Sequence, residues 1–210
     1  NIQIVNCTTP ASYFHALRRQ IHRNFRKPLI VFTPKSTLRH PNNISHIEEF
    51  TGKTSFHRVI DDDIKNPKRV VFCSGKIFYE LDDYRSEHKI KDVKIIRIEQ
   101  IYPFPFDRLS EILMKYKDCE MIWAQEEQKN MGTWGFVKSR IRHVFVRNNY
   151  EKKIHYVGRR PAAAPATGIS KRHITNQMLI KELALKSPLK RVIKERSGVS
   201  FMKFKNLPKE

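Results

Sequence analysis

Two adjacent carboxylates, Glu126 and Glu127, are the residues best placed for acid–base chemistry. They follow the apolar run 120–124, and Trp134 then begins an expected helix. In open α/β sheets, ligands bind beyond the carboxyl ends of strands, where paired carboxylates could move protons. However, the sequence sets no nucleophile or group of metal ligands beside them. We therefore favour an interface or structural role for Glu126, Glu127 and Trp134, and we expect neither a catalytic residue nor a metal site.

The segment 158–168 is extended, rich in alanine and proline, and poor in side chains. Such a segment is rigid, and another backbone can approach it closely. Two interpretations stay open: a substrate-facing loop, or a segment that packs across a sheet edge or a subunit interface. We favour the second, in which Arg159 and Arg160 pair with carboxylates.

Five basic residues flank an apolar strand near the start of the chain: Arg26, Lys27, Lys35, Arg39 and His40. They have no acidic neighbours in sequence. The cluster could bind phosphate, as in a nucleotide or acyl-CoA effector. The competing interpretation is a set of salt bridges to other domains, and we favour this one.

The charge of the chain is strongly positive and unevenly distributed. Of the formal net charge of +20, seven charges come from residues 1–47, which contain no Asp or Glu, and six from residues 186–210. A basic chain could bind nucleic acid or another anion, but the basic residues are not interleaved with aromatics in any recognised module. A free-standing anion-binding or nucleic-acid-binding module is therefore the alternative that we do not favour.

Other composition features limit the class of protein. With 40% hydrophobic residues, the chain of 210 residues can build a packed core. Its three cysteines are widely spaced, which favours a reducing compartment and argues against a zinc site. No apolar run approaches the roughly 18 residues of a membrane span, so no membrane partner is expected. The first residue, Asn1, and the absence of a signal-peptide pattern suggest an internal start.

The pattern of apolar residues predicts a strand at 2–6, a helix from Pro10 to about 24, and a strand at 29–33. Thr8 or Thr9 can cap the helix, and Phe14, Leu17 and Ile21 are expected on its inner face. This αβ unit is too small to bury both of its faces alone.

Downstream of a connector at 41–68, strands alternate with helices of 10–14 residues. This alternation predicts an α/β fold with a mainly parallel sheet and helices on both faces. Residues 186–210 are expected to form a loosely held basic tail, with a possible short element at 192–193 or 199–204. The expected strands are 69–73, 93–99, 120–124 and 154–157, and the expected helices are 76–88, 107–116, 134–145 and 175–185.

Several motifs, taken in order and spacing, resemble one family: the carboxyl-terminal part of the thiamine-dependent first component of 2-oxoglutarate dehydrogenase. The similarity covers residues 1–185, and the related 2-oxoadipate enzyme is the closest alternative. Thr37 departs from the family, which usually has Leu there, and the tail from Lys186 matches nothing in it. The motifs are Thr9-Pro10-Ala11, Leu17–Gln20, Arg26–Pro41, Lys68–Lys76, Arg97–Pro105, Gln125–Glu127 with Trp134, and Gly158–Gly168.

The resemblance implies that residues 1–40 end a transketolase-like pyrimidine-binding domain with its last αβ unit, that 41–68 are a linker, and that 69–185 form the transketolase-like carboxyl-terminal domain. It also implies a parent oxidoreductase of the tricarboxylic acid cycle, which uses thiamine diphosphate and Mg²⁺ to decarboxylate 2-oxoglutarate and passes the succinyl group to lipoyl-lysine. The Gly-Asp-Gly diphosphate motif is absent, so this piece alone should be inactive and bind no cofactor.

The resemblance further implies partners and a location. The partners would be upstream domains of the same enzyme, a second copy in a homodimer, and the lipoyl-bearing dihydrolipoyl succinyltransferase component. The compartment would be the mitochondrial matrix, or the cytoplasm of a bacterium. Nucleotide and acyl-CoA effectors of the family make Lys27, Lys35 and Arg39 candidate effector-binding residues. The direct role of this chain would then be dimer assembly and effector binding.

Overall fold

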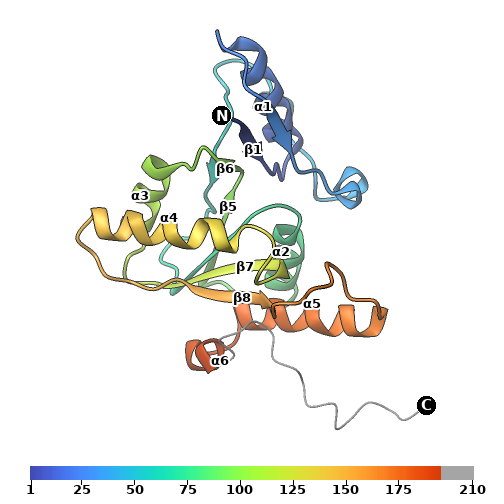
Figure 1. The fold of residues 1–210 in the computed structure, drawn as a ribbon, viewed down its shortest axis with the longest axis vertical. Helices are drawn as coiled ribbons and strands as arrows, with labels where there is room; N and C mark the ends of the chain where they lie inside the picture. The colour runs from blue at the N-terminus through green and yellow to red at the C-terminus, as the bar shows by residue number, and fades with distance from the viewer. Residues whose placement is uncertain (195–210) are drawn as a thin grey trace.

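A five-stranded sheet forms the centre of the computed structural model, which describes residues 1–194 (Figure 1). The strand order is β3-β5-β4-β7-β8. The last four of these strands are parallel, and β3 pairs antiparallel with β5 at one edge. The strands are β3 (Val59–Ile60), β5 (Val93–Ile98), β4 (Arg69–Cys73), β7 (Glu120–Gln128) and β8 (His155–Arg159).

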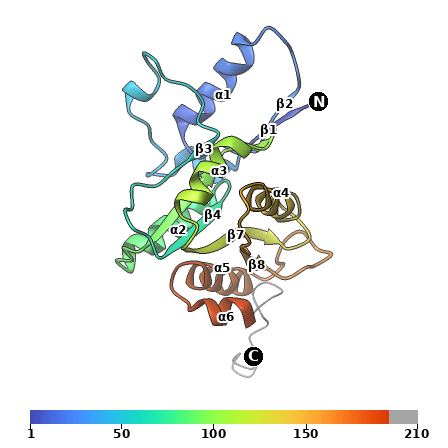
Figure 2. The ribbon, with the colours of Figure 1, turned by 90° about the vertical axis from the view of Figure 1, so that its left-hand side faces the viewer.

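Helices cover both faces of this sheet, as Figures 1 and 2 show from two directions. Because successive side chains of a strand point to opposite faces, each strand feeds two cores. In β4, Val70 and Phe72 pack on the side of α3 and α4, whereas Val71 and Cys73 pack on the side of α2 and α5. The predicted α/β class is confirmed. The covering helices are α3 (Phe106–Lys115) and α4 (Trp134–Arg147) on one face, and α2 (Ile77–Glu87), α5 (Ser170–Leu185) and α6 (Leu189–Lys194) on the other.

A second, three-stranded sheet lies beside the first and carries the amino-terminal residues. Its order is β2-β1-β6, with β1 parallel to β2 and antiparallel to β6. Strand β6 follows β5 after a single residue, Glu99, so the chain passes directly from the large sheet to the small one. The strands are β1 (Gln3–Val5), β2 (Leu29–Val31) and β6 (Gln100–Tyr102).

Helix α1 (Pro10–His22) begins as the sequence predicts but buries a different face. The Thr9 hydroxyl accepts a hydrogen bond from the Ser12 amide at 3.1 Å, and proline occupies the first turn. The expected inner residues Phe14, Leu17 and Ile21 are 41%, 42% and 71% exposed. This prediction was wrong because small and polar side chains, which allow close approach, form the contact surface instead. The buried residues of α1 are Ala11, Ser12, His15 and Ala16.

Other boundaries differ from the sequence prediction. Strand β7 continues through Gln128 instead of ending at Ala124, so the two expected site carboxylates lie within the strand. The 3₁₀ helix η1 (Lys35–Arg39) precedes the connector, which itself contains the 3₁₀ helix η2 (Ile47–Glu49) and then β3. The first part of the expected loose tail forms α6, where Val192 is buried. The possible element at 199–204 lies outside the described residues.

Candidate functional site

A buried carboxylate joins the small sheet and α1 to the large sheet. Glu99 is fully buried between β5 and β6. Its Oε2 accepts hydrogen bonds from the Thr8 amide at 2.8 Å and the Ser12 hydroxyl at 2.7 Å, and its Oε1 accepts one from the Thr8 hydroxyl at 2.6 Å. The Asn6 amide also donates to the Glu99 carbonyl at 2.8 Å. The segment that leads into α1 is thus held by one side chain from a position about 90 residues later in the chain.

The charge at this junction is balanced by local donors. Burial raises the pKa of Glu99, while the hydrogen bonds from Thr8 and Ser12 and the charge of Arg97 lower it, so the net direction is upward. Arg97 donates to the Thr8 hydroxyl at 2.9 Å, which places the guanidinium beside the carboxylate through a shared partner. Because buried charges without partners are costly, these donors are what allow a carboxylate to sit here.

A second set of contacts ties the connector to the same junction. The Tyr79 hydroxyl donates to the Thr8 carbonyl or to Asn43 Oδ1, which is 2.7 Å away. The His40 ring lies against the Tyr79 ring, with centroids 4.5 Å apart. His40, just beyond η1, therefore packs at the junction, where its Nε2 also lies 4.0 Å from Asp83 Oδ2.

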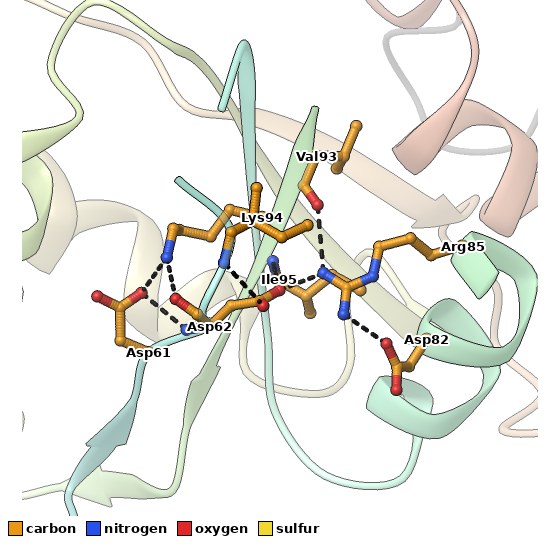
Figure 3. Close-up of polar contacts among 8 residues, drawn as sticks. Asp61, Asp62, Asp82, Arg85, Val93, Lys94 and Ile95 are labelled. Carbon is orange, nitrogen blue, oxygen red and sulfur yellow. Dashed lines mark hydrogen bonds and ion pairs between the residues drawn. The ribbon is translucent and has the colours of Figure 1, made fainter. Parts of the chain in front are cut away.

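Two acidic residues, Asp61 and Asp62, cross the edge of the large sheet just after β3, and we call them the strap (Figure 3). Lys94 points into the edge from β5, and its side chain is only 2% exposed. Its Nζ lies 3.0 Å from Asp61 Oδ1 and also donates to the Asp62 carbonyl. The ammonium group lies 5.1 Å above the centre of the Tyr116 ring. The strap therefore supplies the polar partners that a buried lysine in an apolar strand requires.

Asp62 completes the strap. Its carboxylate accepts a hydrogen bond from the Ile95 amide at 2.9 Å and forms an ion pair with Arg85 of α2. Arg85 also binds Asp82 at 2.6 Å and the Val93 carbonyl at 3.3 Å. The strap therefore links the connector, β5 and α2, which fixes the antiparallel edge strand β3 just before it.

A third polar network lies at the carboxyl edge of the parallel sheet, between the ends of β4 and β7. This is the point where the strand order reverses, the usual ligand position in such sheets. Lys76 Nζ lies 2.5 Å from Glu126 Oε2 and 3.6 Å from Glu80 Oε1. Burial lowers the pKa of Lys76, but the hydrogen bonds and charges of Glu126 and Glu80 outweigh it and raise the pKa. Gln177 of α5 donates to both carboxylates at 3.2–3.3 Å.

The predicted structural role of Glu126 fits these contacts, because its partners occupy the carboxylate. Glu127 is exposed, and its backbone carbonyl accepts a hydrogen bond from the Tyr156 hydroxyl at 3.2 Å. Trp134 is buried against the Tyr156 ring, with centroids 5.2 Å apart. Lys76 is the amine in contact with Glu126, and its raised pKa keeps it a protonated cation instead of a nucleophile, so these contacts orient a turn.

Gln125 organises this turn and was missed by the sequence analysis. Its Oε1 accepts hydrogen bonds from the Trp134 amide at 3.0 Å and the Trp123 ring nitrogen at 2.9 Å. Its Nε2 donates to the Met131 carbonyl at 2.9 Å. At Gly132, φ is +65° and a Cβ would lie 3.0–3.1 Å from Gln125 and Glu127, so this position requires glycine. An amide directly after the apolar run 121–124 was the available signal.

The segment 158–168 is held against the end of β7. The side chain of Asn130 donates to the Ala162 carbonyl at 3.0 Å and accepts from the Ala162 amide at 3.1 Å. Gln128 donates to the Ala164 carbonyl at 3.0 Å. The structure thus places this segment along the sheet edge, which is the packing interpretation of its sequence.

Within residues 1–194 Arg159 forms no ion pair with a carboxylate, contrary to the sequence prediction. Its Nη2 lies 2.9 Å from Gln177 Oε1 and 2.9 Å from His173 Nδ1, and its Nη1 lies 3.5 Å from the Thr167 hydroxyl. Glu126, which shares Gln177 with Arg159, is already engaged by Lys76. Side chains of α5 therefore hold Arg159, which leaves it with a positioning role. Arg160 follows directly at the start of the same segment.

We expect Asn130→Ala to release segment 158–168 without unfolding the domain. Because two hydrogen bonds to Ala162 are lost, each worth about 0.5–1.5 kcal/mol, the Ala162 amide should exchange about tenfold faster or more. Hydrogen–deuterium exchange read by mass spectrometry or NMR measures this directly. The matched control is Asn24→Ala, an exposed asparagine outside this segment; unchanged exchange at Ala162 in Asn130→Ala would contradict the role given to Asn130.

The three candidate effector residues are exposed and only partly grouped. Lys35 and Arg39 lie four residues apart on η1, whereas Lys27 lies between α1 and β2 with its Nζ 5.5 Å from the centre of the Phe25 ring. Within residues 1–194 none of the three forms an ion pair with a carboxylate. The expected salt bridges are thus not made inside the described part of the chain, and all three cations are available to an anion.

Other possible chemistry receives no support from the described residues. Burial raises the pKa of the Cys7 and Cys73 thiols to about 12, so neither is a ready thiolate. The described part of the chain brings together no group of three or more His, Cys, Asp or Glu that could bind a metal ion. Among residues 1–194, no helix is long and apolar enough to cross a membrane.

Two family models match the chain, and they identify first its class of protein and then its family. Residues 1–41 match the family model of the transketolase pyrimidine-binding domain, which places β1, α1 and β2 among transketolase-like proteins. Residues 44–185 match the model of the 2-oxoglutarate dehydrogenase C-terminal region. The chain belongs to this family, and the resemblance seen in its motifs is confirmed.

Curated relatives agree with the family. The chain is 44% identical over 199 residues to the 2-oxoglutarate dehydrogenase E1 component of Brucella abortus strain S19, and 43% identical to that of Brucella anthropi. The protein of Brucella ovis with the same name is 44% identical. Each alignment covers 88% of this chain and 20% of the relative, so the chain spans about a fifth of the length of the relatives that it matches.

Proposed function

We propose that this chain supplies the carboxyl-terminal part of a thiamine-dependent 2-oxoglutarate dehydrogenase first component and serves there to assemble and orient the active-site domains. The observation that carries the proposal is the order of the two family matches along one chain, 1–41 and 44–185. The junction at Glu99 supports it, because it fixes the pyrimidine-type unit on the α/β domain.

The parent enzyme would oxidatively decarboxylate 2-oxoglutarate and transfer the succinyl group to a lipoyl-bearing succinyltransferase component. The relatives named above support 2-oxoglutarate over 2-oxoadipate, since all three carry the first name. Thiamine diphosphate would supply the carbanion chemistry in the parent. Residues 1–194 do not fit a site for its diphosphate and Mg²⁺, because they hold neither a metal-binding cluster nor a Gly-Asp-Gly motif. We assign no step of that chemistry to this chain.

A regulatory role for the basic residues that flank β2 belongs to the same proposal. Lys27, Lys35 and Arg39 are exposed cations without ion-pair partners in the described residues, and phosphate groups bind such side chains through charge-assisted hydrogen bonds. A nucleotide or acyl-CoA effector would be the ligand. A homodimer of the parent enzyme is the expected assembly.

A full-length chimera tests the proposal. The chain should replace the carboxyl-terminal fifth of the Brucella abortus relative in one reading frame, and release of CO₂ from 2-oxoglutarate should be compared with the unmodified relative and with 2-oxoadipate as substrate. We expect activity within about tenfold of the relative and a preference for 2-oxoglutarate. A folded chimera without decarboxylase activity would refute the proposal, and a preference for 2-oxoadipate would refute the substrate.

A further inference from the structure

The outer side of α1 carries an apolar stripe that nothing in the described residues covers. Tyr13, Leu17 and Ile21 are spaced four residues apart and therefore lie on one face of the helix; we call them the α1 ridge. They are 39%, 42% and 71% exposed. Exposed apolar groups aligned on one face, as here, mark a binding surface more often than scattered ones do.

The small sheet has an unpaired edge. Among the described residues, strand β2 pairs only with β1 and forms this edge. Backbone groups at such an edge can accept a further strand. A parallel strand added there needs a crossover connection, usually a helix that packs on one face of the sheet. The ridge and the open edge therefore suit one partner that adds both a strand and a helix.

Positive charge predominates around the ridge, although Glu48 and Glu49 of η2 lie beside α1, where the Glu49 carbonyl is 2.7 Å from His15 Nε2. Residues 1–47 contain seven Lys and Arg and no Asp or Glu. None of these seven forms an ion pair within residues 1–194, since the one ion pair from this stretch joins His40 to Asp83. Arg18 instead donates to the Thr54 carbonyl at 3.5 Å, and Arg26 to the Phe25 carbonyl at 3.2 Å.

This pattern argues against a self-complementary contact. A two-fold interface through the α1 ridge would bring the same seven cations of two copies together, and the η2 carboxylates Glu48 and Glu49 beside α1 are too few to offset them. Complementary interfaces instead place negative charge against positive charge. Aliphatic side chains such as Leu17 and Ile21 also suit a helix better than a nucleic-acid base, which stacks on aromatic rings.

From these observations we infer that the α1 ridge binds an amphipathic helix with an acidic rim, supplied by the part of the parent polypeptide outside this chain. The inference rests on the proposed function and adds the chemistry of the partner surface. Any homodimer contact of the parent then uses a different surface. The relatives are about five times longer than the matched region, which leaves ample sequence to provide such a helix.

Carbodiimide cross-linking of the full-length chimera tests the inference directly, because this reagent joins lysines only to carboxylates in contact. We expect a link from Lys27 to an Asp or Glu upstream of this chain, within one polypeptide when heavy-isotope and light-isotope copies are mixed. The link should be absent in Lys27→Arg. A Lys27 link between heavy and light copies, or the absence of any Lys27 link, overturns the inference.

Hydrogen exchange provides the second measurement. Amides of α1 should exchange at least about tenfold more slowly in the chimera than in the isolated chain, and Ile21→Asp should remove this protection. Val146→Asp is the matched control, since Val146 is an equally exposed apolar residue on α4. Equal exchange in both proteins would overturn the inference even if the chimera is active, and an inactive but protected chimera would refute the proposed function alone.

If the chimera does not fold, the inference can be tested on the isolated chain. The inference predicts no concentration-dependent dimer through the α1 ridge in sedimentation experiments, and no oligonucleotide binding that depends on Arg26. A dimer that Ile21→Asp abolishes and Val146→Asp preserves would overturn the inference. So would oligonucleotide binding that Arg26→Glu abolishes and Lys171→Glu, a change at an exposed α5 cation, preserves.

Discussion

Replacing Glu99 with alanine should lower the free energy of unfolding of this chain by about 3–5 kcal/mol, the usual cost of removing one partner from a buried charged network. The substitution leaves the Thr8 amide and the Thr8 and Ser12 hydroxyls without their acceptor, in a place that water does not reach. Urea unfolding followed by circular dichroism measures the change, with the denaturant slope checked for two-state behaviour. A loss below about 1 kcal/mol would show that the junction does not depend on this carboxylate.

Glu99→Gln separates the shape of the side chain from its charge. The amide keeps one acceptor oxygen for the Thr8 amide and Ser12, so we expect a smaller loss, of about 1–2 kcal/mol. The pH dependence follows from the raised pKa of Glu99, whose ordinary value is 4.5. The folded state takes up the proton more readily than the unfolded state, so the wild type gains stability relative to Glu99→Gln as the pH falls toward 4.5 and loses it as the pH rises. The opposite slope would contradict this assignment.

The second large effect is expected at Lys94. Lys94→Ala removes a buried ammonium that binds Asp61 and the Asp62 carbonyl, and it also leaves a cavity beneath the Tyr116 ring. We expect a loss of about 3–5 kcal/mol in the free energy of unfolding. The edge strand β3 lies directly before the strap, so its amides should lose protection from exchange together with the global stability.

Two further variants identify the cause. Lys94→Met keeps most of the packing but leaves Asp61 unpaired, so its loss should be about 1–3 kcal/mol, and adding Asp61→Asn should recover part of it. Lys91→Ala, at an exposed lysine just before the same strand, should change stability by less than about 0.5 kcal/mol. If Lys94→Met equals Lys94→Ala, the ion pair rather than packing accounts for the whole effect; if neither variant differs from Lys91→Ala, the strap is not a stabilising feature.

The parts of the fold that depend on local patterns were predictable from the sequence. The β4–α2 unit shows why: an apolar run, a glycine turn and a helix with Ile77, Leu81 and Tyr84 on one face each have a clear period, and all three residues are buried. The inner face of α1 was not predictable in the same way. Its partners are Glu99, about 90 residues away, and the connector residues Ser45 and Glu49, and small residues set the contact there.

The residues of the candidate sites likewise differ in whether the sequence alone could reveal their roles. The roles of Glu126 and Trp134 could be inferred because they border a turn that the sequence marks with glycines. The roles of Glu99 and Lys94 could not, since a single charged residue in or beside an apolar strand does not reveal its partner. Arg159 shows a third case: the need for partners was foreseeable, but their identity depended on how α5 lies against the sheet.

The chain passes from β5 directly into β6, and this bears on whether the two matched regions can fold as separate modules. The two family models meet at residues 41–44, yet strand β6, from the second model, is hydrogen-bonded to β1 of the first. The boundary between the two family models is therefore not a boundary between units that fold independently. Recombination that exchanged residues 1–41 between relatives would also have to preserve the match between Thr8 and Glu99, so these positions are expected to be inherited together.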